Sequence, residues 1–287
     1  MKTNLLLTLA AAATLLTACN NDQETDTTWN GEIRLSSGVT VQQTRANSAP
    51  DTQIASGQTV QVVVTKQAAD DKTYAGYTQA LTADGNGNFT GGSTMYYPES
   101  GKGVSIYAYH PASASASFVT NADQSTGTNY FNSDLLYSAA TDYARQSAAH
   151  PLTFKHKLSK LTYTLVAGTG TPTITGATVK WKNVCNTIGF TAATGLLGSS
   201  ATNPVAITPH ATYGAIIVPQ TVSANTALLE VTLANGGVLT YTPTDAQVFD
   251  TEKSYNYKIT VNLSELEVTS SITPWTAVGE RTGDAKM

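Results

Sequence analysis

Apolar residues recur at every second position along most of the chain, whereas the spacing of an amphipathic helix is almost absent. The alternation is clearest in residues 33–41, 60–64, 104–109, 161–165 and 255–263. A period of two sends successive side chains to opposite faces of a β-strand. Thr, Val, Ile and Tyr, which fill these segments, suit such a half-buried surface. The pattern therefore predicts many short strands.

Gly- and Asn-rich turns separate the predicted strands. They include DGNGN (residues 84–88), GTG (168–170) and NGG (235–237). Short strands joined by such turns are typical of antiparallel sandwiches, whereas a parallel sheet needs helices between its strands. Residues 133–146 are expected to hold a helical turn or an irregular loop. We place a domain boundary just after this segment, which predicts two sandwich domains at residues 31–148 and 149–287.

The composition fits an ordered all-β protein. The chain has 287 residues, of which 41% are hydrophobic and 13% are charged. That length suits one large or two ordinary domains, and a helix bundle would contain more Glu, Lys and Leu. The formal net charge is −4, and Lys and Arg form no block. Because phosphate binding needs clustered cations, nucleic acid is not expected as a partner.

The N-terminus has the layout of a lipoprotein signal peptide. Lys2 precedes an apolar run at residues 5–16, which is followed by small residues and Cys19. A membrane span needs about 20 apolar residues, so this run is too short for an anchor helix. The last four residues, LTAC, resemble a lipobox. We expect residues 1–18 to be removed, Cys19 to carry lipid, and residues 19–30 to form a polar tether; the alternative is a plain signal peptide that happens to contain a cysteine.

The other cysteine is Cys185, and with Cys19 taken by lipid it has no partner within the chain. The mature protein is therefore expected to hold together without disulfides although it is exported. Its stability must come from a hydrophobic core.

Four segments follow one another through the rest of the chain. They are YP and VSIYAYHP within residues 97–111, LTFKHKLSKL (152–161), GAIIVPQT (214–221), and a run from Tyr255 through Leu263 to Ile272 and Trp275. In this order, behind a lipobox, they resemble the fimbrillin family, the subunits of type V pili of Bacteroidota. The likeness covers nearly the whole chain.

The resemblance implies a fold of two transthyretin-like antiparallel β-sandwich domains in tandem. It also implies an assembly route in which the precursor reaches the outer membrane as a lipoprotein. An arginine-specific protease then cuts after the first strand. The groove that this strand leaves is filled by the C-terminal strand of the next subunit, which is donor-strand exchange.

The residues of this chain fit that scheme. Residues 32–42 predict the first strand, and Arg45 follows in an exposed polar stretch suited to proteolysis. We expect cleavage between Arg45 and Ala46; Arg34 is the weaker alternative because it lies within the strand. An incoming strand would satisfy the backbone groups left unpaired. The donor is expected between Leu266 and the C-terminus, with apolar positions Val268, Ile272 and Trp275.

Catalytic and metal-binding patterns are missing from the sequence. The four histidines lie far apart without ligand spacing, so neither a metal nor a cofactor is expected. His156 is expected to pack or hydrogen-bond at a domain junction. Residues 84–95 begin like a calcium loop, but Phe89 and Met95 replace the required Gly and Glu. A G-x-S-x-G motif is also absent, so the protein is not expected to be an enzyme.

The sequence therefore predicts a structural pilus subunit. Its expected partners are other copies of itself or related pilins, and the outer membrane through the lipid on Cys19 until processing. The mature protein would lie in an extracellular surface pilus. One alternative is a tip adhesin or glycan-binding surface lipoprotein of the same fold, because the chain has 14 tyrosines that could stack on sugars of a host or bacterial ligand. Another alternative is an anchor subunit that keeps its lipid.

Overall fold

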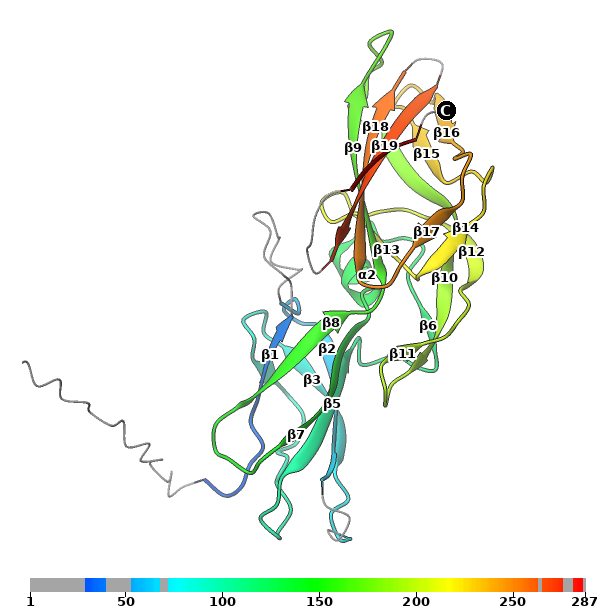
Figure 1. Ribbon diagram of the computed structural model, residues 1–287. Coiled ribbons are helices and arrows are strands. Elements are labelled where there is room, and N and C mark those ends of the chain that lie inside the picture. The colour runs from blue at the N-terminus through cyan, green and yellow to red at the C-terminus, as the bar shows by residue number, and fades with distance from the viewer. Residues whose placement is uncertain (1–28, 40–52, 68–71, 263–264, 276–280, 286–287) are drawn as a thin grey trace, which may run out of the picture. The chain divides into compact units, whose positions relative to one another are not determined.

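The protein is built almost entirely of β-strands, as the alternation predicts (Figure 1). The structure is a computed structural model that describes residues 29–39, 53–67, 72–262, 265–275 and 281–285. Gly31–Met287 forms one compact unit. The all-β prediction is confirmed, and the division into two transthyretin-like domains stays a prediction.

A seven-stranded sheet takes most of the first half of the chain. Its strands are β1 (Leu35–Val39), β2 (Thr59–Lys66), β3 (Tyr77–Ala83), β4 (Phe89–Thr90), β5 (Val104–His110), β7 (Leu136–Tyr143) and β8 (His150–His156). They lie in the order β1-β8-β7-β5-β2-β3-β4. Neighbours are antiparallel except β1 and β8, which run parallel. In β2 and β5 every second side chain is buried, so one face of this sheet carries a core.

The turn between β3 and β4 closes on an aspartate. The Asp84 carboxylate accepts hydrogen bonds from the backbone N–H groups of Asn86, at 2.7 Å, and Asn88, at 3.0 Å. Gly85 and Gly87 have φ angles of +81° and +91°, which residues with a Cβ atom rarely adopt. The segment that imitates a calcium loop is therefore a hairpin turn.

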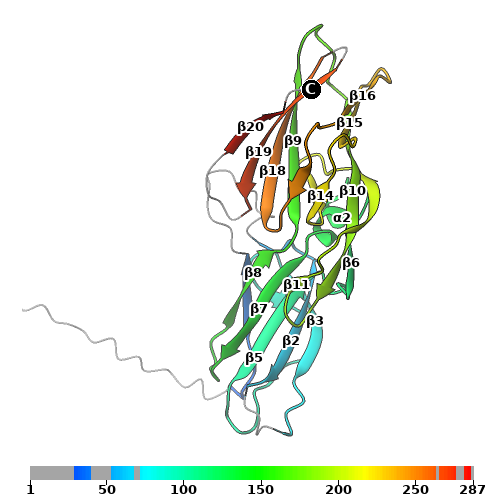
Figure 2. The same cartoon turned by 45° about the vertical axis from the view of Figure 1, so that its right-hand side comes forward.

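Three further sheets form the rest of the fold. A five-stranded sheet contains β13 (Ala215–Ile217), β9 (Ser159–Ala167), β18 (Lys253–Val261), β19 (Leu266–Pro274) and β20 (Arg281–Ala285), in that order. A six-stranded sheet contains β6 (Ser117–Val119), β10 (Thr178–Thr191), β11 (Leu196–Leu197), β12 (Thr202–Ile207), β15 (Leu229–Thr232) and β16 (Val238–Tyr241). The strands β14 (Gln220–Val222) and β17 (Gln247–Phe249) pair with each other. In Figure 2 the strands β9, β18 and β19 form one layer and β10, β15 and β16 another.

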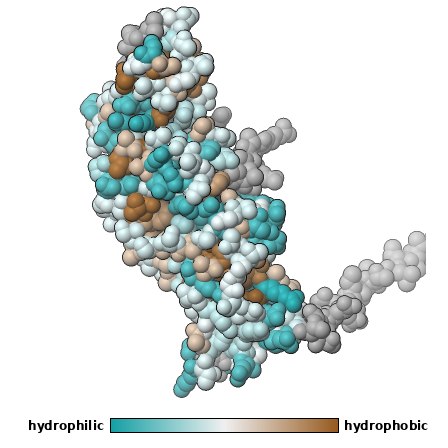
Figure 3. All heavy atoms as spheres, turned by 180° about the vertical axis from the view of Figure 1, so that it is seen from behind, coloured by the Kyte–Doolittle hydropathy of each residue, from teal (hydrophilic) through white to brown (hydrophobic). Residues whose placement is uncertain are grey.

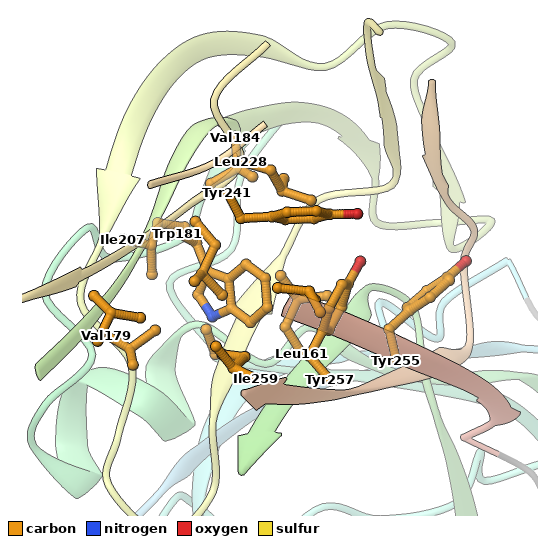
Figure 4. Packing of buried hydrophobic residues seen from close by; sticks show 14 of the residues in the cluster. Leu161, Val179, Trp181, Val184, Ile207, Leu228, Tyr241, Tyr255, Tyr257 and Ile259 are labelled. Atoms are coloured by element: carbon orange, nitrogen blue, oxygen red, sulfur yellow. The ribbon is translucent and has the colours of Figure 1, made fainter. Parts of the chain in front are cut away.

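A single hydrophobic core fills the space between the five- and six-stranded sheets. Trp181 on β10 is fully buried in it, and its ring lies 4.9 Å from that of Tyr257 on β18 in an edge-to-face arrangement. Figure 4 shows the indole in the middle of the cluster with Tyr241 and Tyr257 beside it. Two packed sheets around one core make a β-sandwich.

The prediction for residues 133–146 is wrong in position. The helix α2 lies earlier, at Gly127–Asn132, and begins where the Thr126 hydroxyl accepts a hydrogen bond from Asn129 N–H. Residues 136–143 instead form strand β7. The first three residues of β7 are all buried, so the alternation that marks a strand is lost there.

The predicted boundary at residue 148 stays a prediction, because strands on both sides of it pair with strands of the other half. The strand β8, which begins at His150, pairs with β1 and β7 in the first sheet, whereas β6, at Ser117–Val119, pairs with β10 in the six-stranded sheet. A further hydrophobic cluster contains Leu135 and Tyr137 from the first half together with Phe190 and Ile216 from the second. The two halves therefore share a core.

Candidate functional site

The segment at residues 31–39 is bonded to the backbone on both of its sides. On one side β1 runs parallel to β8, with Leu35 opposite His150 and Val39 opposite Phe154 (Figure 1). The N–H of His150 also donates to the carbonyl of Arg34 at 2.8 Å. Of the predicted first strand, residues 32–42, residues 35–39 form β1 and residues 32–34 precede it. Residues 40–42 lie outside the described residues.

On its other side the same segment meets the loops around β4. The N–H of Ile33 donates to the carbonyl of Met95 at 2.8 Å, and Tyr97 N–H donates to Gly31 at 3.0 Å. Further along, Ser37 N–H donates to the carbonyl of Gly87 at 2.7 Å. Residues 31–39 therefore occupy a slot between β8 and residues 87–97, which we call the β1 slot.

Side chains of this segment enter the core beneath the β1 slot. Ile33 is 7% exposed and Val39 is 8% exposed, whereas Arg34 points outward and lies 3.9 Å from Glu32. A cavity of about 310 Å³ borders the segment and is also lined by Leu81 and Met95. Residues 32–35 of the segment form one side of this cavity.

A buried polar network stands at one end of the β1 slot. The Gln146 amide donates to Nδ1 of His150 at 3.3 Å, and Nε2 of His150 forms a hydrogen bond with the Tyr97 hydroxyl. The Tyr97 hydroxyl also donates to the carbonyl of Ala144 at 3.2 Å. Burial lowers the pKa of His150, because a charged ring would be poorly solvated there.

Stability is expected to fall as the pH drops below about 6.5, the ordinary pKa of histidine. The unfolded chain takes up a proton on His150 at a higher pH than the folded chain does, because the folded pKa is lowered. The stabilisation is therefore complete above that pH and is lost below it. Chemical denaturation at about pH 7.5 and about pH 5 should show a smaller pH effect in His150→Gln than in the wild type. Equal effects in both proteins would contradict this role of His150.

The structure separates the three predicted donor positions. Val268 is 1% exposed and lies in the sandwich core, opposite Ile259 of β18. Ile272 is 42% exposed, and Trp275 is buried just beyond the end of β19. β20 pairs with the outer edge of β19 and is the last strand of the sheet among the residues that the structure describes.

The other predicted positions lie outside the described residues. They are Cys19, Arg45 and Ala46. Cys185 is described as a free, partly buried thiol, and burial raises its pKa. Within the described part of the chain, acidic, histidine and cysteine side chains nowhere gather in a group that could hold a metal. The helices of that part include none with the length and apolar character needed to cross a membrane.

Sequence reasoning missed the partners that complete the β1 slot. The strand β8, which forms one side of the β1 slot, is about 115 residues from β1 along the chain. Parallel pairing between strands so far apart leaves no pattern in the sequence near either strand. Met95, Tyr97 and His150 were not assigned to this site. Among the tyrosines, Tyr107 packs on Tyr137 and the ring of Tyr109 meets that of Phe190, whereas Tyr96 is 40% exposed.

Comparisons with known proteins give one family and one fold. A family model described as fimbrillin-like matches residues 44–275. Two solved structures of candidate cell adhesion proteins have a TM-score of 0.64. The one from Bacteroides uniformis is 20% identical and is covered over 98% of its length by 86% of this chain. The one from Bacteroides ovatus is 18% identical, with 99% of its length and 86% of this chain covered.

A third similar structure is a candidate cell adhesion protein from Bacteroides thetaiotaomicron. It has a TM-score of 0.52 and 12% identity, with 92% of its length and 80% of this chain covered. At these identities the structures are evidence of the fold. No curated protein matches the chain.

Proposed function

Because this chain belongs to the fimbrillin-like family, we propose that it is a structural subunit of a cell-surface pilus that assembles by exchange of the strand in the β1 slot. The observation that carries this proposal is the position of residues 31–39, which are bonded to backbone on both sides and bury Ile33 and Val39. A strand from another subunit could replace those bonds and side chains one for one. The family and its fold point to a structural role without catalysis, at the cell surface and in contact with other pilin subunits.

Export and maturation complete the proposal. Residues 1–18 act as a signal peptide, lipid on Cys19 holds the precursor at the outer membrane, and residues 19–30 form the tether. A protease then cuts between Arg45 and Ala46, which frees the segment that contains β1 from the rest of the chain. The family match begins at residue 44, next to this bond, and leaves out β1. That agreement supports β1 as a separable segment.

The donor in this proposal is the C-terminal region from Leu266 onward, with Val268, Ile272 and Trp275 as its predicted apolar positions. β20 supports the assignment because it lies at the edge of its sheet and pairs only with β19 among the described residues. A terminal edge strand can leave its sheet without breaking pairs between other strands. The family match also ends at residue 275, before β20.

Digestion of the folded precursor with an arginine-specific protease tests this function. We expect a new N-terminus at Ala46, followed by a ladder of oligomers that resist SDS. Arg45→Ala should abolish both, and Arg34→Ala is the matched control that should leave both intact. A confirmed cut at Arg45 without oligomers, under conditions that favour association, would contradict strand exchange.

A second candidate function is adhesion to a surface ligand. A cavity of about 700 Å³ is lined by the exposed side chains of Leu196 and Val248 together with Ser199 and Thr221. On the face shown in Figure 3, hydrophobic residues form small patches among hydrophilic ones. A glycan array with the wild type and Val248→Asp tests this function; adhesion predicts a signal that the substitution removes, and silence across glycans and matrix proteins counts against it.

A further inference from the structure

Trp275 lies directly after β19. We call the part of the chain that follows Trp275 the C-terminal tail, and the position of Trp275 the tail root. Its indole is 6% exposed and stacks on the ring of His156, with ring centroids 3.7 Å apart and an interplanar angle of 11°. Its backbone N–H donates to the carbonyl of Glu252 at 2.8 Å. The ammonium of Lys160 lies 5.7 Å from the ring centroid, within reach of a cation–π interaction. Trp275 is therefore held by both its backbone and its ring.

The ring beneath Trp275 is itself fixed in place. His156 ends β8 and is 2% exposed, and its Nδ1 lies 3.0 Å from each carboxylate oxygen of Asp134. Asp134 is 7% exposed and precedes β7, the other neighbour of β8. A buried carboxylate that bonds one nitrogen sets the orientation of an imidazole. The stacking surface is thus presented at a defined angle.

Each of the two stacked rings has one polar atom without a partner. Nε2 of His156 and Nε1 of Trp275 are both buried without a hydrogen-bond partner. Each unpaired polar atom costs stability, and a pair of apolar rings would avoid that cost.

β19 and β20 are held very differently. β19 pairs with β18 along its whole length and places Leu266 and Val268 in the sandwich core. β20 pairs with β19 from Val268 to Ile272 and, among the described residues, has no strand on its other side. Among the described residues, Trp275 thus lies between a strand with partners on both sides, β19, and a strand with a partner on one side, β20.

The tail root also shares a strand with the β1 slot. β8 begins at His150, which is opposite Leu35 of β1, and ends at His156, whose ring stacks on that of Trp275. One strand thus links the wall of the β1 slot to the starting point of the tail. A tail with a fixed origin loses less conformational freedom when it binds than a tail that moves freely.

We propose that Trp275, stacked on His156, is a positioning residue that keeps β19 in its own subunit and fixes where the exchangeable tail begins. This narrows the donor, proposed above as the region from Leu266 onward, to the part of the chain that follows Trp275. The three predicted donor positions, Val268, Ile272 and Trp275, then stay in their own subunit. This inference rests on the proposed strand exchange and names the part of the C-terminal region that moves.

Amide hydrogen exchange on the uncleaved monomer tests the anchoring step independently of polymerisation. Trp275→Ala should speed exchange in residues 266–285 by about tenfold or more relative to β9 and β10, because the tail root opens locally. Trp275→Phe should keep most of the protection, since a ring can still stack on His156. Tyr130→Ala is the matched control: it removes another buried aromatic ring of the same cluster, and should show no selective effect on residues 266–285.

Unchanged exchange in Trp275→Ala, or the same pattern as in Tyr130→Ala, would overturn the anchoring role. After cleavage at Arg45, Trp275→Ala should form ladders about tenfold more slowly than the wild type, and Trp275→Phe should form them at nearly the wild-type rate. Ladders from Trp275→Ala at the wild-type rate would overturn the positioning role. Failure of the wild type to form ladders would instead contradict the proposed function and leave the exchange result standing.

Discussion

Trp181→Ala is expected to lower the free energy of unfolding by about 3–5 kcal/mol, the range for removing a buried tryptophan. Trp181 is fully buried between the two sheets of the sandwich, and its ring meets that of Tyr257 at 4.9 Å. Alanine would leave a cavity that close-packed neighbours can fill only in part. Chemical denaturation measures the loss. A loss under about 1 kcal/mol would mean that this core collapses around the smaller residue.

Two companion variants sharpen this expectation. Trp181→Phe should cost much less, because the indole Nε1 has no hydrogen-bond partner and phenylalanine therefore loses only ring area. Leu196→Ala is the surface control: its side chain is 64% exposed, and its effect should stay within about 0.5 kcal/mol. A cost for Trp181→Phe as large as that for alanine would indicate that the indole shape itself is required.

Removal of residues 1–45 is expected to lower Tm by roughly 10–20 °C. Ile33 and Val39 are buried, and each such side chain contributes about 1.5–3 kcal/mol. For a chain of this size, each kcal/mol shifts Tm by about 2–4 °C. The backbone groups that β8 and residues 87–97 offer to β1 would also lose their partners. Thermal unfolding of a chain that starts at Ala46 measures the effect.

A peptide that covers residues 31–39 should restore the lost stability when added to the shortened chain. The same peptide with Ile33→Asp and Val39→Asp is the matched control, because it keeps the backbone but cannot bury these two side chains. Equal rescue by both peptides would show that binding in the β1 slot depends only on the peptide backbone. No rescue by either peptide would contradict the view that β1 is exchangeable.

Local pattern was sufficient for most individual strands. Alternation located β2, β5, β9 and β18, and the turn at residues 84–88 was placed correctly, because both depend on neighbours within a few residues. Where burial became continuous, as at the start of β7, the same reasoning failed and α2 was misplaced. His156 does pack and hydrogen-bond as expected, through Trp275 and Asp134.

The β1 slot was only partly predictable. The sequence indicated a first strand and a C-terminal donor region, but gave no sign of Met95, Tyr97 or His150 as parts of the site. These residues come together because β1 is parallel to β8 and bonded to residues 87–97 on its other side. Such partners are chosen by the shape of the folded sheet.

The sequence by itself determined that this protein is made of short strands, that it resembles the fimbrillin family, and where its local turns lie. Only the tertiary structure decided which strands are neighbours, that β8 joins the first sheet, and that Trp275 rests on His156 while β20 stays at an edge. The physical reason is the separation along the chain over which each interaction acts. Side-chain alternation and turn chemistry act between residues close in the chain, whereas strand pairing and ring stacking are settled by packing among residues far apart in it.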